Sequence, residues 1–149
     1  MKTITPAPSG TPSVAILREA ASTDDHIHLG RGEWLINDQV NLAGARAQHI
    51  TADPEAVVRV VLDGKRAGVL LRDKDTPTRI ALPKVVAEGH FGGQEAIIYS
   101  YGVGRLHIHD TNISGVTKGA CISIRATKTA GVQDVLVENC KLYSRASQL

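Results

Sequence analysis

The chain has 149 residues, the size of one domain, and its 17 Lys and Arg residues nearly balance its 15 Asp and Glu residues. This balance excludes the strongly basic surface that is typical of nucleic-acid-binding proteins. No apolar run approaches the roughly 20 residues that a membrane span needs, and the N-terminus lacks the apolar stretch of a signal peptide.

We therefore expect neither a nucleic acid nor a membrane as a partner. We also expect no export by the signal-peptide route unless a leader precedes this sequence, so the compartment stays open. The two cysteines, Cys121 and Cys140, fit neither a metal-ligand spacing nor a disulfide framework, and we expect free thiols. One Trp, one Phe and three Tyr leave the core to aliphatic side chains, which suits stacked strands.

The N-terminal segment 1–12 is rich in Pro, Ser, Thr and Gly, and we expect it to form an extended arm. The stretch Thr11–Ser13 then predicts the start of a short helix, with a hydroxyl near the N-cap and its proline in the first turn. Val14, Leu17 and Ala21 share one helical face, so residues 13–22 predict an amphipathic helix.

Short strands fill the rest of the chain. Apolar residues alternate with polar ones or form short Val- and Ile-rich runs, and Gly, Pro or Asp corners interrupt them. The expected strands are His26–Leu29, Trp34–Ile36, Val40–Leu42, His49–Thr51, Val57–Leu62, Val69–Leu71, Arg79–Leu82, Val85–Val86, Ala96–Ser100, Leu106–Ile108, Ala120–Ile124 and Val135–Val137.

Two segments, Leu106–Ser114 and Val135–Tyr143, repeat one pattern at a constant offset along the chain. In each segment two apolar residues occupy alternate positions and the residues between them point outward. A short polar corner follows, and after it comes one more apolar residue. A second strand-like run precedes each copy. Internal repeats of about 20–50 residues are typical of solenoids and propellers. The matched apolar positions are Leu106 with Val135, Ile108 with Val137, and Ile113 with Leu142.

The repeat predicts an all-β fold: a right-handed, single-stranded parallel β-helix of about five coils over residues 13–149. Its open first coil would be covered by the helix at residues 13–22. No helical stretch separates the strands, which argues against a doubly wound α/β sheet. A β-sandwich is the main alternative, but its strands would not repeat a whole coil at a fixed offset.

The segment Ser13–Gly64 resembles the N-terminal part of the pectin-lyase-like β-helix proteins, and it is most similar to the alginate and chondroitin lyases of polysaccharide lyase family six. The resemblance covers the capping helix, the strand and glycine-rich turn Ile27–Trp34, and the Ile-Thr strand, proline corner and valine-rich strand of Ile50–Gly64. Phage tail spikes and epimerases begin in the same way.

The resemblance implies an acidic polysaccharide as the partner and Ca²⁺ as the cofactor. In those lyases a calcium ion held by Asn and Glu residues neutralises a uronate carboxylate, a lysine removes the C5 proton and an arginine assists. No residue of this sequence is assigned to that catalytic set.

Outward side chains of stacked strands form rows, because equivalent positions on adjacent coils lie side by side. Aligning the two strands that precede the repeat places Tyr99 beside Ser123 and Tyr101 beside Arg125. Aromatic rings stack on sugars and a guanidinium binds carboxylates, so Tyr99, Tyr101 and Arg125 are predicted to bind substrate. The alternative is that both tyrosines simply cover a solvent-facing surface.

His107 and His109 point outward on one strand, with His109 beside Glu138, and His26 and His28 repeat this arrangement on the first coil. A His-x-His pair beside a carboxylate can bind a transition metal, but alternate strand positions are also ordinary places for polar residues. We predict His107 and His109 as substrate-binding residues and predict no metal site.

Asp110 and Asn139 occupy equivalent corners, where Asx side chains tolerate left-handed backbone, and we expect a structural role for both. The end of the chain is too short for a second cap, so we expect either a longer β-helix or self-association through the open last coil.

Two functional hypotheses remain. The first is a carbohydrate-active or carbohydrate-binding β-helix, including a partial or non-catalytic unit, which as an enzyme would be a polysaccharide lyase that acts by β-elimination. The second is a structural or adhesion module, such as a phage tail-spike part or a self-assembling unit.

Overall fold

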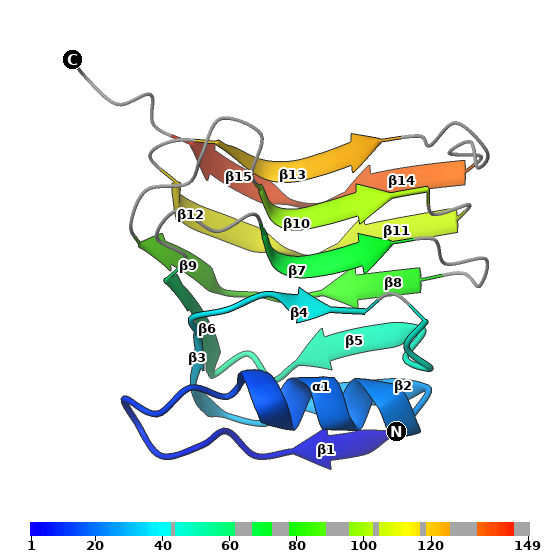
Figure 1. The fold of residues 1–149 in the computed structure, drawn as a ribbon. Coiled ribbons are helices and arrows are strands. Elements are labelled where there is room, and N and C mark those ends of the chain that lie inside the picture. Colours follow the sequence, from blue (N-terminus) through cyan, green and yellow to red (C-terminus); the bar gives the residue numbers. More distant parts are fainter. Residues whose placement is uncertain are drawn as a thin grey trace.

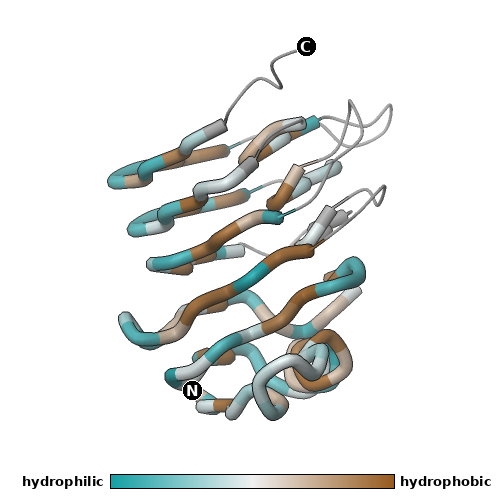
Figure 2. The backbone as a smooth tube through the Cα atoms, turned by 90° about the vertical axis from the view of Figure 1, so that its left-hand side faces the viewer, coloured by the Kyte–Doolittle hydropathy of each residue, from teal (hydrophilic) through white to brown (hydrophobic). Residues whose placement is uncertain are grey.

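The computed structural model describes residues 1–42, 44–61, 67–72, 78–88, 96–102, 105–116, 119–125 and 134–144. In this part of the chain fifteen short strands and one helix form a parallel β-solenoid, which confirms the predicted fold (Figure 1). The strands of successive coils stack on one another in parallel sheets, as the tube of Figure 2 shows from the side.

The helix is α1 (Val14–Thr23). The strands are β1 (Lys2–Ile4), β2 (His26–Leu29), β3 (Gly32–Ile36), β4 (Val40–Asn41), β5 (His49–Ala52), β6 (Ala56–Val61), β7 (Ala67–Arg72), β8 (Thr78–Ala81), β9 (Val85–Glu88), β10 (Ala96–Tyr101), β11 (Arg105–His109), β12 (Asn112–Val116), β13 (Ala120–Arg125), β14 (Asp134–Glu138) and β15 (Lys141–Ser144).

Three parallel sheets form the sides of the solenoid. Sheet A has the order β1-β2-β5-β8-β11-β14, sheet B the order β3-β6-β9-β12-β15, and sheet C the order β4-β7-β10-β13. Four turns therefore have one strand in each sheet, and β14 and β15 belong to a further turn. The predicted count of about five coils is slightly too high, because the last turn has no sheet C strand among the described residues.

The offset between the two repeated segments is the length of one coil. In the parallel pairing of β11 with β14, Ile108 lies opposite Val137, and in that of β12 with β15, Ile113 lies opposite Leu142. A residue and its counterpart in the repeat thus occupy the same place on adjacent coils. The two segments were aligned correctly from their hydrophobic pattern alone.

The predicted Asx corners are confirmed. Asp110 and Asn139 have φ angles of 47° and 50°, in the left-handed region, and the Asn139 side-chain amide donates a hydrogen bond to the Asp110 carboxylate. Asn and Asp enter this region more readily than other non-glycine residues. Both corners therefore turn the chain from sheet A into sheet B in the same way.

Aliphatic ladders fill the interior of the coils. On the inner face of sheet A, Ile27, Ile50, Ile80 and Ile108 lie in one row across four coils. All four side chains are at most 6% exposed. Burying an aliphatic side chain of this size contributes roughly 1.5–3 kcal/mol, so each added coil is stabilised by its contact with the coil below it.

The helix α1 covers the N-terminal end of the solenoid, as predicted. Val14, Leu17 and Ala21 are buried against the first coil. The prediction for the helix start needs one correction: Pro12 precedes the helix and forms an isolated bridge with Leu35, rather than lying in the first helical turn. Ser13 is the N-cap residue, so a hydroxyl does lie there as predicted, but it accepts a hydrogen bond from the Ala7 amide (3.0 Å) and makes no capping hydrogen bond.

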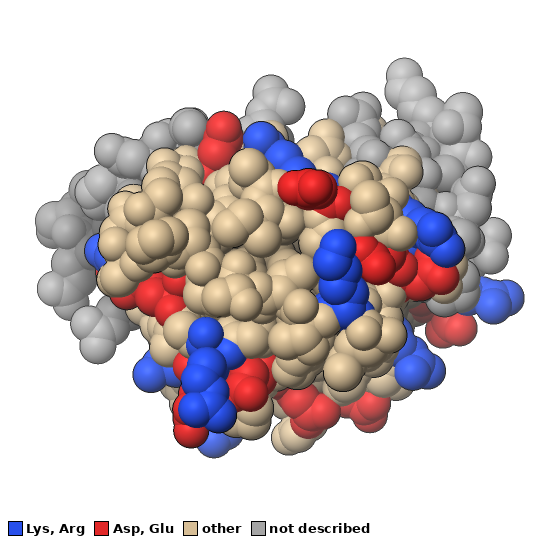
Figure 3. Space-filling model, turned by 90° about the horizontal axis from the view of Figure 1, so that it is seen from below, with Lys and Arg blue, Asp and Glu red and all other residues tan. Residues whose placement is uncertain are grey.

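The N-terminal arm contributes to the same end. β1 pairs in parallel with β2 and begins sheet A, and Ile4 is buried beneath the first coil. Seen from this end, uncharged side chains cover much of the surface and charged groups of both signs lie mostly around its rim (Figure 3). No helix in the described ranges is long and apolar enough to cross a membrane.

Candidate anion-binding site on sheet A

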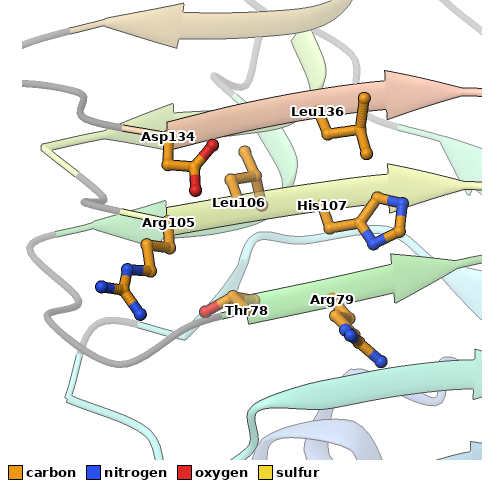
Figure 4. Close-up of a pocket in the computed structure, with 7 residues that line it drawn as sticks. All are labelled: Thr78, Arg79, Arg105, Leu106, His107, Asp134 and Leu136. Carbon is orange, nitrogen blue, oxygen red and sulfur yellow. The ribbon is translucent and has the colours of Figure 1, made fainter.

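A shallow pocket of about 230 Å³ lies on the outer face of sheet A. It is formed by the first halves of three neighbouring strands, β8, β11 and β14 (Figure 4). The residues that line it are Thr78, Arg79, Arg105, Leu106, His107, Asp134 and Leu136. We call this the sheet A pocket.

Strand register explains why these side chains meet. Arg79 of β8 lies opposite His107 of β11, and His107 lies opposite Leu136 of β14. In the neighbouring outward position, Arg105 lies opposite Asp134. Because adjacent parallel strands are about 4.8 Å apart, these groups share one small area of surface.

The two arginines of the pocket have no ion pair with any residue that the structure describes. This distinguishes them from Arg31, Arg46 and Arg59, which bind Glu or Asp side chains within 3.6 Å, 2.7 Å and 2.8 Å, respectively. In Figure 4 the Arg79 and Arg105 side chains lie on either side of Thr78 and extend away from Asp134. The pocket therefore presents two guanidinium groups that are available to an anion.

The histidines of β11 each contact a carboxylate, and His109 lies beside Glu138 in the strand register, as predicted. Glu138 lies opposite His109 in the strand register, yet its Oε1 atom is 2.7 Å from the Nε2 atom of His107. His109 instead contacts Asp110 through Nδ1 at 2.8 Å. Two hydrogen bonds lower the pKa of the Asp110 carboxyl, the one with His109 more strongly than the one with Asn139.

The first coil repeats the His-x-His pattern without a carboxylate. The His26 Nε2 and His28 Nδ1 atoms both contact the Thr51 hydroxyl, at 3.0 Å and 2.7 Å. Among the described residues, no group of three or more His, Cys, Asp or Glu side chains is arranged to hold a metal ion.

Tyr99, Tyr101 and Arg125 lie on a different side of the solenoid. The predicted register is confirmed, since β10 pairs with β13 so that Tyr99 lies opposite Ser123 and Tyr101 opposite Arg125. The two tyrosine rings are half-buried, with centroids 6.3 Å apart. These residues belong to sheet C, whereas His107 and His109 belong to sheet A, so the predicted substrate-binding residues do not form one site.

Sequence reasoning missed Arg79, Arg105 and Asp134. The signal for two of them was present, because Arg105 and Asp134 immediately precede the two repeated segments and the repeat places such residues side by side. Arg79 lies in a coil whose sequence does not repeat this pattern. Its position beside His107 follows only from the observed pairing of β8 with β11.

Both cysteines are free thiols, as predicted. Cys121 is buried, and burial raises the pKa of its thiol. The Cys140 thiol is a hydrogen-bond donor to the Glu138 carbonyl oxygen (3.2 Å) in the corner after β14. A raised pKa disfavours the thiolate, the nucleophilic form, so packing accounts for Cys121.

Comparisons of the chain with models of protein families, with curated proteins and with solved structures give no match. The β-helix architecture is therefore established by the structure, and the sheet A pocket has to be interpreted from its own chemistry.

Proposed function

We propose that this chain is a β-helix that binds an acidic polysaccharide through the sheet A pocket. The observation that carries this proposal is the pair of guanidinium groups, Arg79 and Arg105, which line one pocket without an ion pair in the described part of the chain. A guanidinium matches a carboxylate in a planar, two-point geometry. Uronate or sulfate groups of a glycan are anions of this kind.

The other lining residues suit a sugar ring. Leu136 is 49% exposed and gives the pocket an apolar wall against which the C–H face of a sugar can pack. Asp134 supplies carboxylate oxygen atoms that can accept hydrogen bonds from sugar hydroxyls. An open pocket of this shape admits one unit of a long chain and leaves room for its neighbours.

The pocket does not suit the calcium ion that the family resemblance implies. Ca²⁺ takes six to eight oxygen ligands, many of them carboxylates. The sheet A pocket has one carboxylate, Asp134, and two arginines that would repel the ion. The role of calcium in neutralising a uronate carboxylate would here fall to Arg79 and Arg105.

Binding is tested by isothermal titration calorimetry with trigalacturonate as the probe and maltotriose as the uncharged control sugar. We expect Arg79→Ala and Arg105→Ala each to weaken binding of trigalacturonate by about tenfold or more, since a hydrogen bond to a charged group contributes roughly 1.5–3 kcal/mol. Arg46→Ala is the matched control, because this arginine is bound to Asp25 elsewhere on the surface. Equal binding of maltotriose, or unchanged binding in both pocket variants, would contradict the proposal.

Lyase activity is a separate question with its own readout. β-Elimination needs a base near the sugar C5 proton, and His107 supplies the imidazole among the pocket residues. Catalysis would raise absorbance near 235 nm as the unsaturated product forms from alginate, pectate or chondroitin. Binding without such absorbance would identify a non-catalytic module.

A specific observation also favours the second candidate function, self-association as a structural or adhesion unit. Val137 and Leu142 continue the interior ladders of the solenoid, but they are 41% and 42% exposed, and Tyr143 beside them is 62% exposed. A second copy that presents the same last coil would cover these ladders symmetrically. Sedimentation equilibrium should then show a dimer that Leu142→Asp converts to a monomer, while a monomeric wild-type protein would exclude this function.

A further inference from the structure

The histidines that the structure describes all lie on the outer face of sheet A, the sheet that also carries the pocket. They occupy two adjacent rows. The first row contains His26, His49, Arg79 and His107, and the second contains His28 and Thr51 and, further along the stack, His109. The strand pairing thus brings together side chains that lie far apart in the sequence.

Four of the rings form a continuous chain of contacts. His26 stacks on His49 with ring centroids 4.2 Å apart, His49 lies 6.4 Å from His109, and His109 lies 4.6 Å from His107. His49 and His109 are on β5 and β11, which β8 separates. Their rings approach each other across β8, whose residue Arg79 is the register neighbour of His49.

The hydrogen bonds of this cluster are unevenly distributed. His107 and His109 contact carboxylates, and His26 and His28 share one threonine hydroxyl. The Nε2 atom of His49, at the centre of the chain of rings, is buried and has no hydrogen-bond partner among the described residues.

The pKa values of the two rings at the N-terminal end of the cluster are lowered by burial and then by nearby positive groups, which favours the neutral form of both rings. Burial is the main cause that lowers the pKa of both His26 and His49. The N-terminal amine and His28 lower the pKa of His26 further, and Arg79 and the other histidines act in the same way on His49. The acidic groups near the rings, Glu138 and Asp110, face His107 and His109 at the other end.

We propose that this histidine cluster is an acid-dependent extension of the sheet A pocket. Near neutral pH the rings of His26 and His49 are stacked and uncharged, and only the arginines bind an anion. On acidification these rings take up protons and become a second anion subsite, on the two coils that contain β2 and β5, for the next units of the same acidic chain. The inference rests on the proposed function, because the pocket supplies the first point of attachment.

The rows run along the stacking axis, which suits a linear ligand with regularly spaced negative groups. The strands that carry His26 and His49 are about 4.8 Å apart, and the two ring centroids are 4.2 Å apart. A uronate carboxylate stays ionised at pH 5.5, and imidazole rings take up protons as the pH falls from 7.5 toward this value. Binding of such a ligand should therefore be accompanied by proton uptake, since each carboxylate stabilises the charged form of the ring that it contacts.

The test compares oligogalacturonates of three and six units by calorimetry at pH 7.5 and pH 5.5. We expect the hexamer to bind about tenfold more tightly at pH 5.5, because two ion pairs of modest strength form with His26 and His49. We expect the affinity for the trimer, which fills the pocket, to change much less between the two pH values. Repeating the titration in buffers of different ionisation enthalpy should reveal proton uptake with the hexamer only.

Variants separate this inference from the proposed function. His49→Gln should abolish the increase in hexamer affinity at pH 5.5 and leave trimer affinity unchanged. Arg79→Ala should lower the affinity for both ligands at both pH values. If the trimer binds but the hexamer shows no gain at pH 5.5, the inference is wrong and the proposed function stands. If neither ligand binds the wild-type protein, both are wrong.

An NMR titration of the histidines in the wild-type protein tests the inference without a variant, so its result does not depend on whether a variant folds. Adding hexagalacturonate should raise the pKa of His26 and His49, and an unchanged pKa in a sample that binds the hexamer would overturn the inference.

Discussion

The two ends of the solenoid use the same kinds of side chain but differ in how these side chains are covered. At the first coil, Val14 and Leu17 of α1 close the end and are 6% and 7% exposed. At the last described coil, Val137 and Leu142 occupy interior ladder positions and are 41% and 42% exposed. The position of a coil in the stack, rather than its residue types, therefore decides how much each aliphatic side chain stabilises the fold.

The largest expected effect comes from one ladder position on two adjacent coils. Ile113 is fully buried, and its neighbour Leu142 is 42% exposed. We expect Ile113→Ala to lower the free energy of unfolding by about 2–5 kcal/mol, because it leaves a cavity between coils. Leu142→Ala should cost less than about 1 kcal/mol, since much of that side chain is already in water.

Urea unfolding followed by far-UV circular dichroism measures both values. Equal losses for the two variants would mean that the last coil is covered in solution, for example by a second copy.

Two glycines with similar backbone angles test how closely the coils pack. Gly44 and Gly115 have φ angles of +69° and +84°. A Cβ atom at Gly115 would lie 2.3 Å from the carbonyl oxygen of Ala87 on the coil below, whereas nothing lies within 4 Å of one at Gly44. Gly44→Ala should cost about 1–2 kcal/mol for the left-handed backbone alone, and Gly115→Ala should cost clearly more.

Thermal unfolding of the two alanine variants gives this comparison directly. A Gly115→Ala variant as stable as Gly44→Ala would show that β12 can move away from β9 at little cost.

The stacked Asx corners provide a smaller effect. Asn139→Ala should cost about 1 kcal/mol, because alanine is disfavoured at a φ of 50° and the hydrogen bond to Asp110 is lost. Asn139→Gly is the control, because glycine adopts this φ freely but cannot make the bond. A glycine variant less stable than the alanine variant would rule out backbone strain as the main cause.

The smallest expected effect is the pH dependence that His26 and His49 contribute near the N-terminal end. Both have a folded-state pKa below that of the unfolded chain, so the unfolded state binds more protons once the pH falls below about 6.5. Stability should therefore decrease from pH 7.5 to pH 5.5. The carboxyls with lowered pKa, such as Asp24 and Glu88, change the stability only at lower pH, where they become protonated.

Urea midpoints at these two pH values, for the wild-type protein and for His49→Gln, measure this contribution. A midpoint that falls equally in both proteins would assign the effect to other groups.

Much of the fold could be predicted because its causes are local. Alternating apolar residues select strands, the offset of the internal repeat sets the coil length, and an amphipathic helix before the first strand predicts the cap. Asp110 and Asn139 were recognised as corners because few residue types tolerate a left-handed backbone. The register of Tyr99 and Tyr101 followed from the same periodicity.

The candidate site could be predicted only in part, because it depends on coils whose lengths differ. His26, His49, Arg79 and His107 lie in one row, although the steps between them along the chain are unequal. No fixed offset in the sequence aligns these residues.

The choice of contacts also belongs to the tertiary structure. Glu138 contacts His107 rather than its register neighbour His109, and the His49 ring lies 6.4 Å from the His109 ring although β8 separates their strands. The amino-acid pattern thus specified a parallel β-helix with a capped beginning, since periodicity and backbone preference act over short distances. Which charged side chains share a pocket was decided by strand register between distant coils, which the local pattern does not encode.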